Sequence, residues 1–279
     1  MKELSLRELQ QIELQILKKI HKVCIEENFR YSLCGGTLLG AIRHKGFIPW
    51  DDDIDILMPR PDYEKLISYC QTHETPFRLI CNQLEKGYGY LSAKVVDPDT
   101  VMIEENNNPK NVAMGVYIDI FPVDGLGDTL QEAKKRFMTK EFLRELLIAA
   151  NWKRFFKSKT HAWYYEPVRF AFFLLSRCVS FEKTIAHIEK YYAKWSFDTS
   201  SYVGCICGDG RLKEICRRVE YTQFIPLTFE DDTFIGLKEY DKYLTRLYGN
   251  YMQLPPEEKR ISHHMFKAYQ INHTKEIVE

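Results

Sequence analysis

Four aspartates lie within residues 51–55, and the apolar residues Ile56, Leu57 and Met58 follow them directly. Like charges at this spacing repel one another, and carboxylates beside a low-dielectric interior resist ionising together. A solvated acidic run would not need apolar residues beside it, so the combination limits how this segment can fold. It predicts a strand with a core face and an acidic face, and a positively charged group next to the acidic face.

The two faces follow from strand geometry, in which alternate side chains point the same way. If the strand extends back to residue 51, Asp51, Asp53 and Asp55 share the acidic face, and Asp52 faces away as a solvated turn residue. Hard cations such as Mg²⁺ prefer oxygen ligands. The pattern therefore predicts that Asp53 and Asp55 bind a divalent cation, which removes their mutual repulsion.

A third carboxylate, Asp119, lies between Ile118 and Ile120 in a segment that is typical of a strand. If this strand lies beside the first, Asp119 converges with Asp53 and Asp55. Three carboxylates can hold one or two metal ions that activate an attacking oxygen and stabilise a leaving one, and Asp119 or a neighbour could act as general base. The alternative is that Asp119 caps a loop or pairs with an arginine, since a buried, unpaired aspartate is costly.

A glycine pair lies upstream of the acidic run. Gly35 and Gly36 end a short strand, and Thr37, a plausible helix cap, opens a helical pattern that runs to His44. Glycines let a backbone approach a phosphate closely, and the N-terminus of a following helix offers free N–H groups. We predict that Gly35, Gly36 and Thr37 bind phosphates, with Arg43 and His44 as nearby counter-charges.

Residues 88–96 and 100–105 predict a hairpin joined at Asp97-Pro98-Asp99. Lys94 alternates with Ser92 in its first strand and could reach a phosphate. The alternative is an edge lysine whose head stays in solvent.

The chain as a whole predicts an α+β fold that divides near residue 127. Residues 1–127 alternate strand and helix patterns, as in a mixed sheet flanked by helices, whereas 128–279 is interpreted as mainly helical. Lys plus Arg and Asp plus Glu are both 39, so the balance does not indicate a nucleic-acid partner. The N-terminus lacks the apolar segment of a signal peptide, and the longest apolar run, 170–175, is too short to span a membrane. We expect a cytoplasmic protein.

Residues 134–177 are basic and aromatic, with 11 Lys or Arg and only 3 Glu. Cations interleaved with aromatic side chains suit the surface of an anionic membrane, such as the inner face of the plasma membrane. The alternative is a helical region with a solvated basic face.

Three segments resemble the LicD family of phosphocholine transferases, relatives of fukutin and fukutin-related protein. They are GGTLLGAIRHKGFIPWDDDIDILMPRPDYEKL (35–66), YIDIFPVDG (117–125) and YLTRLYGNYMQLPPEEKRISHH (243–264). The resemblance implies a nucleotidyltransferase-like fold, with metal ligands at Asp53, Asp55 and Asp119 and with Mg²⁺ or Mn²⁺ as cofactor. It also implies that the C-terminal block completes the site, where Arg260, His263 and His264 are expected to close over the nucleotide.

The activity implied by the resemblance is transfer of phosphocholine from CDP-choline to a sugar hydroxyl of a cell-surface glycan precursor, of the teichoic acid or lipopolysaccharide type and lipid-linked. Other phospho-alcohols, or a nucleotidyl group, are alternatives within the same chemistry. A metal-dependent glycosyltransferase also uses a D-x-D pair, and a non-catalytic phosphosugar-binding module is the remaining alternative.

A choline group carries a fixed positive charge and no N–H donor, so aromatic faces recognise it through cation–π attraction. Trp50 is the nearest candidate to the acidic pair, with Phe47 in the same loop and Tyr117 beside Asp119. The alternative for Trp50 is a core anchor that fixes the approach to Asp53.

Overall fold

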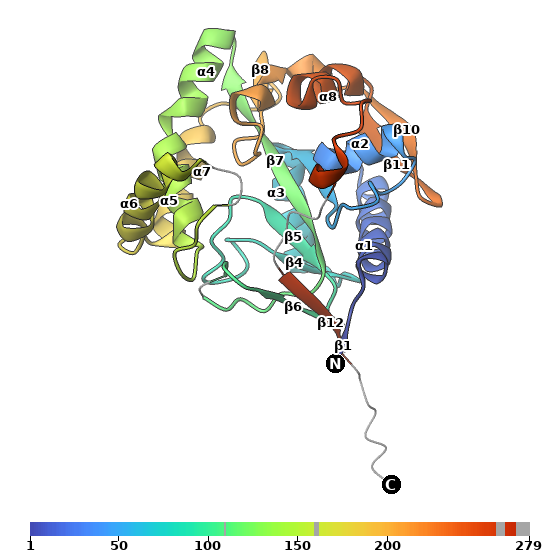
Figure 1. Ribbon diagram of the computed structural model, residues 1–279. Coiled ribbons are helices and arrows are strands. Elements are labelled where there is room, and N and C mark those ends of the chain that lie inside the picture. The colour runs from blue at the N-terminus through green and yellow to red at the C-terminus, as the bar shows by residue number, and fades with distance from the viewer. Residues whose placement is uncertain (109, 159–161, 261–265, 272–279) are drawn as a thin grey trace.

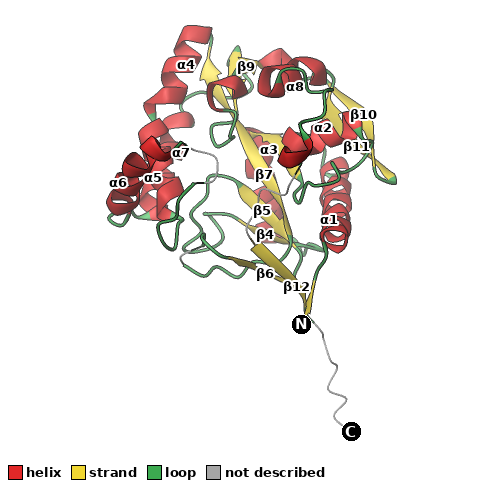
Figure 2. Cartoon of the chain, in the orientation of Figure 1, coloured by secondary structure: helices red, strands yellow, loops and turns green. Residues whose placement is uncertain are grey.

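A mixed sheet runs through the centre of the molecule, with helices packed around it (Figures 1 and 2). The computed structural model describes residues 1–108, 110–158, 162–260 and 266–271. In these ranges the strands are β1 (Lys2–Glu3), β2 (Ser32–Leu33), β3 (Asp55–Pro59), β4 (Arg78–Ile80), β5 (Ala93–Val96), β6 (Thr100–Glu104), β7 (Tyr117–Gly127), β8 (Tyr202–Gly204), β9 (Cys216–Arg217), β10 (Phe224–Phe229), β11 (Asp232–Leu237) and β12 (Phe266–Gln270).

The α-helices of the same ranges surround this sheet. They are α1 (Leu6–Glu26), α2 (Gly35–Arg43), α3 (Arg60–Thr72), α4 (Leu130–Thr139), α5 (Glu141–Ala150), α6 (Glu166–Ser176), α7 (Phe181–Tyr192) and α8 (Tyr240–Tyr248), with short 3₁₀ turns at Trp163–Tyr165, Arg211–Glu214, Arg218–Tyr221 and Glu257–Lys259. None of the helices in the described ranges has the length and apolar character needed to cross a bilayer.

The order of strands places β7 inside the sheet, between β3 and β5. The path is β10-β11-β2-β3-β7-β5-β4, and β8 and β9 extend it beside the second half of β7. β3 and β7 are parallel, with Asp55 opposite Asp119, while β5 and β7 are antiparallel, with Lys94 opposite Asp119. Three charged residues therefore form one row across three neighbouring strands.

The alternation expected of β7 is present. Ile118 and Ile120 are fully buried in the main core, whereas Tyr117, Asp119 and Phe121 are partly exposed on the opposite face. Helices α1 and α3 pack against β7. The same strand also serves a second buried cluster, since its far end packs with α4, α5 and α7. The division near residue 127 stays a prediction.

The first helix shows how the sequence fixes one of these elements. Ser5 and Glu8 form a capping box at the start of α1. Its apolar stripe then buries Leu9, Ile16 and Ile20 in the main core, as the 3.6-residue period predicts.

The expectation of a mainly helical C-terminal half is wrong. Only 130–192 follows that pattern, and β8 to β12 come after it. The hairpin of β10 and β11 joins the main sheet, where β11 lies parallel to β2 and covers an edge that would otherwise be open. In the sequence this hairpin corresponds to two six-residue runs on either side of a turn at Glu230. In the structure Glu230 has a positive φ of 57°.

The predicted hairpin of residues 88–96 and 100–105 does not form either. Both edges of β5 are already used, one by β4 and the other by β7. β6 pairs instead with β12 in a small separate sheet, whose third strand is β1.

Candidate functional site

The charged row across β5, β7 and β3 is the centre of the candidate site. Lys94 Nζ donates to Asp119 Oδ2 at 2.7 Å, and the two side chains are 7% and 14% exposed. Ser92 Oγ also donates to Asp119, at 3.4 Å. The condition that the strand of Asp119 lies beside that of Asp55 is therefore met, and Lys94 is a positive group next to the acidic face. Asp119 is therefore paired with a lysine, whereas the alternative considered from the sequence was a pair with an arginine.

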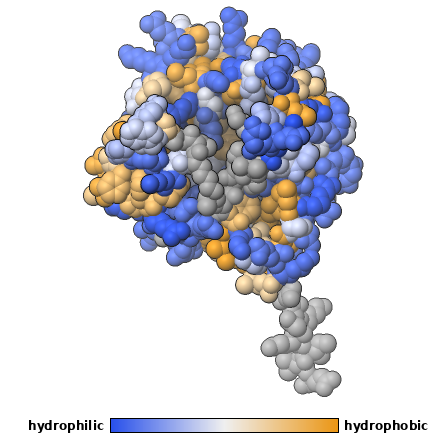
Figure 3. All heavy atoms as spheres, viewed as in Figure 1, coloured by the Kyte–Doolittle hydropathy of each residue, from blue (hydrophilic) through white to orange (hydrophobic). Residues whose placement is uncertain are grey.

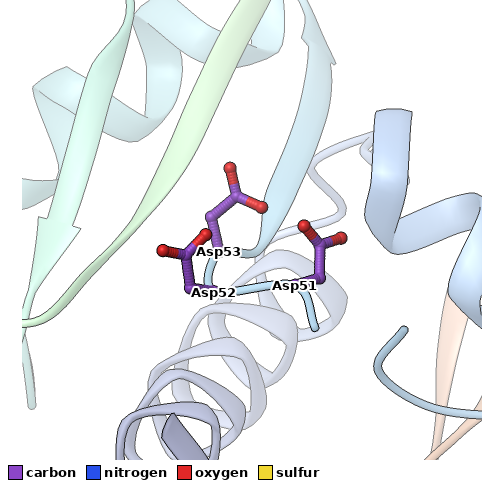
Figure 4. Close-up of side chains that lie close together, drawn as sticks. All are labelled: Asp51, Asp52 and Asp53. Carbon is purple, nitrogen blue, oxygen red and sulfur yellow. The ribbon is translucent and has the colours of Figure 1, made fainter. Parts of the chain in front are cut away.

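The acidic loop before β3 folds differently from the expected strand. Because β3 begins at Asp55, strand alternation does not apply to residues 51–53. Asp51, Asp52 and Asp53 each offer an oxygen that lies within 4.8 Å of the others (Figure 4). Asp52 is buried, so the expectation of a solvated turn residue is wrong.

A further carboxylate, Glu13 of α1, was missed. Its side chain is 1% exposed, and Oε2 has no hydrogen-bond partner in the part of the chain that the structure describes. Burial, and then the negative charges of Asp53, Asp52 and Asp51, raise the pKa of Glu13 well above its usual range. The available signal was a glutamate within the apolar stripe of a helix, four residues after Leu9 and four before Leu17.

The pKa of Asp55 is also raised by neighbouring negative charges. Burial first, and then the charges of Asp53 and Asp119, raise the pKa of its carboxyl well above the usual range, while Lys94 opposes the rise. An oxygen-only set with this excess of negative charge fits a hard divalent cation. Neutralisation by a cation would stabilise the ionised form of every member.

The glycine loop contacts this acidic group directly. Gly35 has φ +51°, and a Cβ there would lie 3.3 Å from Asp55 Oδ2; at Gly36 it would lie 2.6 Å from Asp51 Oδ2. Thr37 does not cap α2, whose N-cap is Cys34. Its hydroxyl instead accepts the backbone N–H of Asp55 at 2.8 Å, which fixes α2 against the start of β3.

Two cavities adjoin the row. One, of about 430 Å³, is lined by Lys94 and Asp119, and the other, of about 410 Å³, by Gly35 and Asp55. Phe121, Cys207 and Asp209 line both. A ligand with two ends could therefore occupy both cavities with its middle over the carboxylates.

Four other predicted residues form a neighbouring group. Arg43 donates to the carbonyl of Tyr251 at 2.7 Å. The rings of His44 and Trp50 meet edge to face at 6.4 Å, and the Arg260 guanidinium lies 5.7 Å from the centre of the Trp50 ring. The C-terminal block thus does pack beside the loop that leads to Asp51. His263 and His264 lie outside the described residues.

Comparison with known proteins gives the class of this site first. Residues 28–153 match the family model of the LicD/FKTN/FKRP nucleotidyltransferase domain. This range contains the glycine loop, the acidic loop and the charged row.

The relatives then specify the family. Over 275 residues the chain is 33% identical to the lipopolysaccharide cholinephosphotransferase LicD of Haemophilus influenzae, which covers 96% of this chain and 99% of that protein. Uncharacterized proteins of Rickettsia prowazekii and Rickettsia typhi are each 50% identical over 42 residues, or 15% of this chain and 16% and 14% of theirs. The chain belongs to the LicD family, and the resemblance in its sequence is confirmed.

Proposed function

We propose that this chain transfers phosphocholine from CDP-choline to a sugar hydroxyl of a cell-surface glycan precursor, of the lipopolysaccharide or teichoic acid type. The main support is the row of Lys94, Asp119 and Asp55 beside a glycine loop at the start of α2. The relative from Haemophilus, named as a cholinephosphotransferase, supports phosphocholine as the transferred group.

In this proposal Asp53, Asp55 and Asp119 hold a divalent cation, Mg²⁺ or Mn²⁺. When bound, the cation would offset the charge on the transferring phosphoryl group and on the departing CMP. Asp119 lies where it could accept the proton of the attacking hydroxyl.

The remaining parts of the site position the donor. Without side chains, Gly35 and Gly36 let a phosphate approach the N–H groups of α2, and Thr37 holds this helix end against Asp55. Lys94 Nζ lies next to Asp119 and can donate to a phosphoryl oxygen. Contacts of the donor with Arg43, His44, Trp50, Arg260 and His263 stay predictions.

The test offers purified protein and Mg²⁺ a panel of CDP-choline, CDP-ethanolamine, CDP-ribitol and CDP-glycerol, and measures CMP release with a glycan acceptor. CDP-choline should be preferred, and Asp55→Asn should lower turnover at least ~100-fold, the scale of losing one electrostatic element of a site. Asp231→Asn is the matched control, because its side chain is 71% exposed on the β10–β11 turn.

Each alternative gives a different result in this assay. A preference for CDP-ribitol or CDP-glycerol would contradict phosphocholine and leave metal-dependent phosphotransfer intact. Consumption of a nucleotide sugar would indicate a glycosyltransferase. Binding without release of CMP would indicate a non-catalytic module.

The acceptor is proposed to be lipid-linked, and the surface of α6 supports this. Apolar side chains of α6 and the turn before it are exposed, and hydrophobic atoms gather over α6 at the left edge of Figure 3. The exposed residues are Trp163, Tyr164, Tyr165, Val168, Phe170, Leu174 and Leu175. We name this set the α6 surface. Such a patch marks an interaction site more often than a solvated face.

We place the α6 surface against the cytoplasmic face of the plasma membrane, where basic residues of 134–177 meet anionic lipid. Sedimentation with vesicles should show binding that rises with the anionic lipid fraction and falls with salt. Trp163→Ser, at a side chain 83% exposed, should weaken sedimentation without changing the unfolding midpoint. Binding that does not depend on the anionic lipid fraction, or no binding, would favour the alternative of a solvated basic face.

A further inference from the structure

The cavity of about 430 Å³ beside Asp119 has walls suited to an organic cation. Tyr90, Tyr117 and Phe156 line it, together with the carboxylate-bearing residues Glu104 and Asp209. Its volume lies in the range of small-molecule sites. Aromatic faces with carboxylates nearby are the surroundings that a quaternary ammonium group prefers.

The structure already places a cation on these rings. Lys94 Nζ lies 3.5 Å from the centre of the Tyr117 ring and 5.6 Å from that of Tyr90. The charge of Lys94 is balanced by Asp119. The other cation of the cavity wall, Arg144, is paired with two glutamates of α5 at 2.8 and 3.1 Å.

The carboxylate of Glu104, in the same cavity wall, differs from that of Asp119 in its partners. Within the residues that the structure describes, Glu104 forms no side-chain ion pair, and its charge acts on both Tyr90 and Tyr117. A cation does contact its backbone, since Lys153 Nζ donates to the Glu104 carbonyl at 2.9 Å. The cavity wall therefore carries a carboxylate beside two aromatic rings, with which a cationic ligand would pair and a neutral sugar or base would not.

The spacing along β7 also suits such a ligand. Tyr117 and Asp119 lie on the same face two residues apart, which is about 7 Å in a strand. The phosphorus and nitrogen of phosphocholine are separated by four bonds, which is shorter than this spacing, so a phosphate near Asp119 would bring the ammonium group toward the ring of Tyr117. We propose that this cavity binds the trimethylammonium group of phosphocholine against Tyr90 and Tyr117, with Glu104 as its counter-charge and the phosphate over the carboxylates.

This inference rests on the proposed function and changes its expected choline contact. Trp50, the residue that the sequence favoured, lies with Arg260 over its ring, and the cavity wall at Asp119 is built from other aromatics. Tyr90 and Glu104 are therefore specificity residues that the sequence did not indicate.

The test measures binding by calorimetry without an acceptor, so that it does not depend on turnover. The ligands are CDP-choline, CMP and the CDP ester of 3,3-dimethylbutanol, which has the shape of choline without its charge. Wild-type protein should bind CDP-choline about tenfold more tightly than the neutral ester, on the scale of a desolvated cation–π contact. Tyr90→Leu and Glu104→Gln should each remove most of this difference and leave the affinity for CMP unchanged.

Tyr90→Phe is the matched control, because it keeps the ring face and should keep the preference for the charged ligand. If Tyr90→Leu fails to fold, Glu104→Gln carries the comparison. Equal weakening of CDP-choline and CMP would assign the cavity to the nucleobase. Unchanged binding of both ligands, with a raised acceptor KM in the turnover assay, would assign it to the sugar. Either result, or no effect, overturns the inference. If CDP-choline binds as expected and is never consumed with an acceptor, the proposed function fails and the binding site stands.

Discussion

Lys94→Met should destabilise the metal-free protein by roughly 3 kcal/mol or more. Methionine keeps the length and apolar stem of lysine but removes the ammonium that holds Asp119 Oδ2 at 2.7 Å. Asp119 then faces Asp55 on the neighbouring strand. Two charges about 5 Å apart, the spacing of strands, repel by about 3 kcal/mol at an effective dielectric constant of about 20. Breaking a buried pair usually costs about 3–5 kcal/mol, which agrees.

The loss should depend on pH in a stated direction. The pKa of Asp55 is raised by burial, Asp53 and Asp119, and Lys94 counteracts the rise. A carboxyl whose folded pKa exceeds its unfolded value contributes stability that is complete below the unfolded pKa and is lost as the pH rises through the folded pKa. Removing Lys94 raises the folded pKa further, so the deficit of the variant should be larger at pH 8 than at pH 5.

Urea unfolding with EDTA at the two pH values measures this. Lys267→Met is the control, since that lysine is 57% exposed in its ion pair with Glu3 and such pairs contribute about 0–1 kcal/mol. Adding Asp119→Asn to Lys94→Met should recover most of the loss. A Lys94→Met protein as stable as the control at pH 8, or no recovery in the double variant, would refute the account of the charged row.

Three further predictions concern the surroundings of the site. Gly36→Ala should lower turnover while the unfolding midpoint changes little, because its Cβ would displace the mobile end of Asp51, 2.6 Å away; activity and thermal unfolding check it together. Burial raises the pKa of Glu214 from 4.5 to about 7, so its contribution to stability is complete below 4.5 and lost as the pH rises through 7. At 1.36 kcal/mol per pKa unit, Glu214→Gln should be more stable than wild type by up to roughly 3 kcal/mol at pH 8 and equal to it near pH 4 in urea unfolding. Arg60→Met should cost about 3–5 kcal/mol in the same assay, because it strands Asp124, which Arg60 binds through two hydrogen bonds of 2.7 and 2.9 Å; a loss below 1 kcal/mol would contradict this.

The sequence predicted the parts of the site that depend on local periodicity. Asp55 and Asp119 each precede apolar strand residues, and their pairing followed once the two strands were assumed to be neighbours. Gly35 and Gly36 were predicted as a phosphate-binding pair, and the structure adds that Gly35 has a positive φ and that both lie close to a carboxylate. The family resemblance added the prediction that Asp53, Asp55 and Asp119 act together as metal ligands, which periodicity alone could not provide.

What the sequence did not predict depends on contacts between distant segments. Asp52 is buried because the loop curls where strand alternation was assumed. Glu13 joins the site only because α1 packs beside that loop, where Gln10 donates to the Asp51 carbonyl at 2.9 Å. β6 pairs with a strand more than 160 residues later, and nothing local distinguishes that partner from β5.

The helix α5 connects the two proposals about substrates. Arg144 and Leu147 of α5, and Asn151 at its C-terminal end, line the cavity beside Asp119, and α6 packs on α5. Ile148 both lines this cavity and is 40% exposed. A lipid-linked acceptor held by the α6 surface would therefore have its sugar one helix away from the carboxylates. This arrangement gives a reason for a basic, aromatic segment to follow β7 directly: the strand that carries Asp119 leads into the helices that would hold the acceptor beside it.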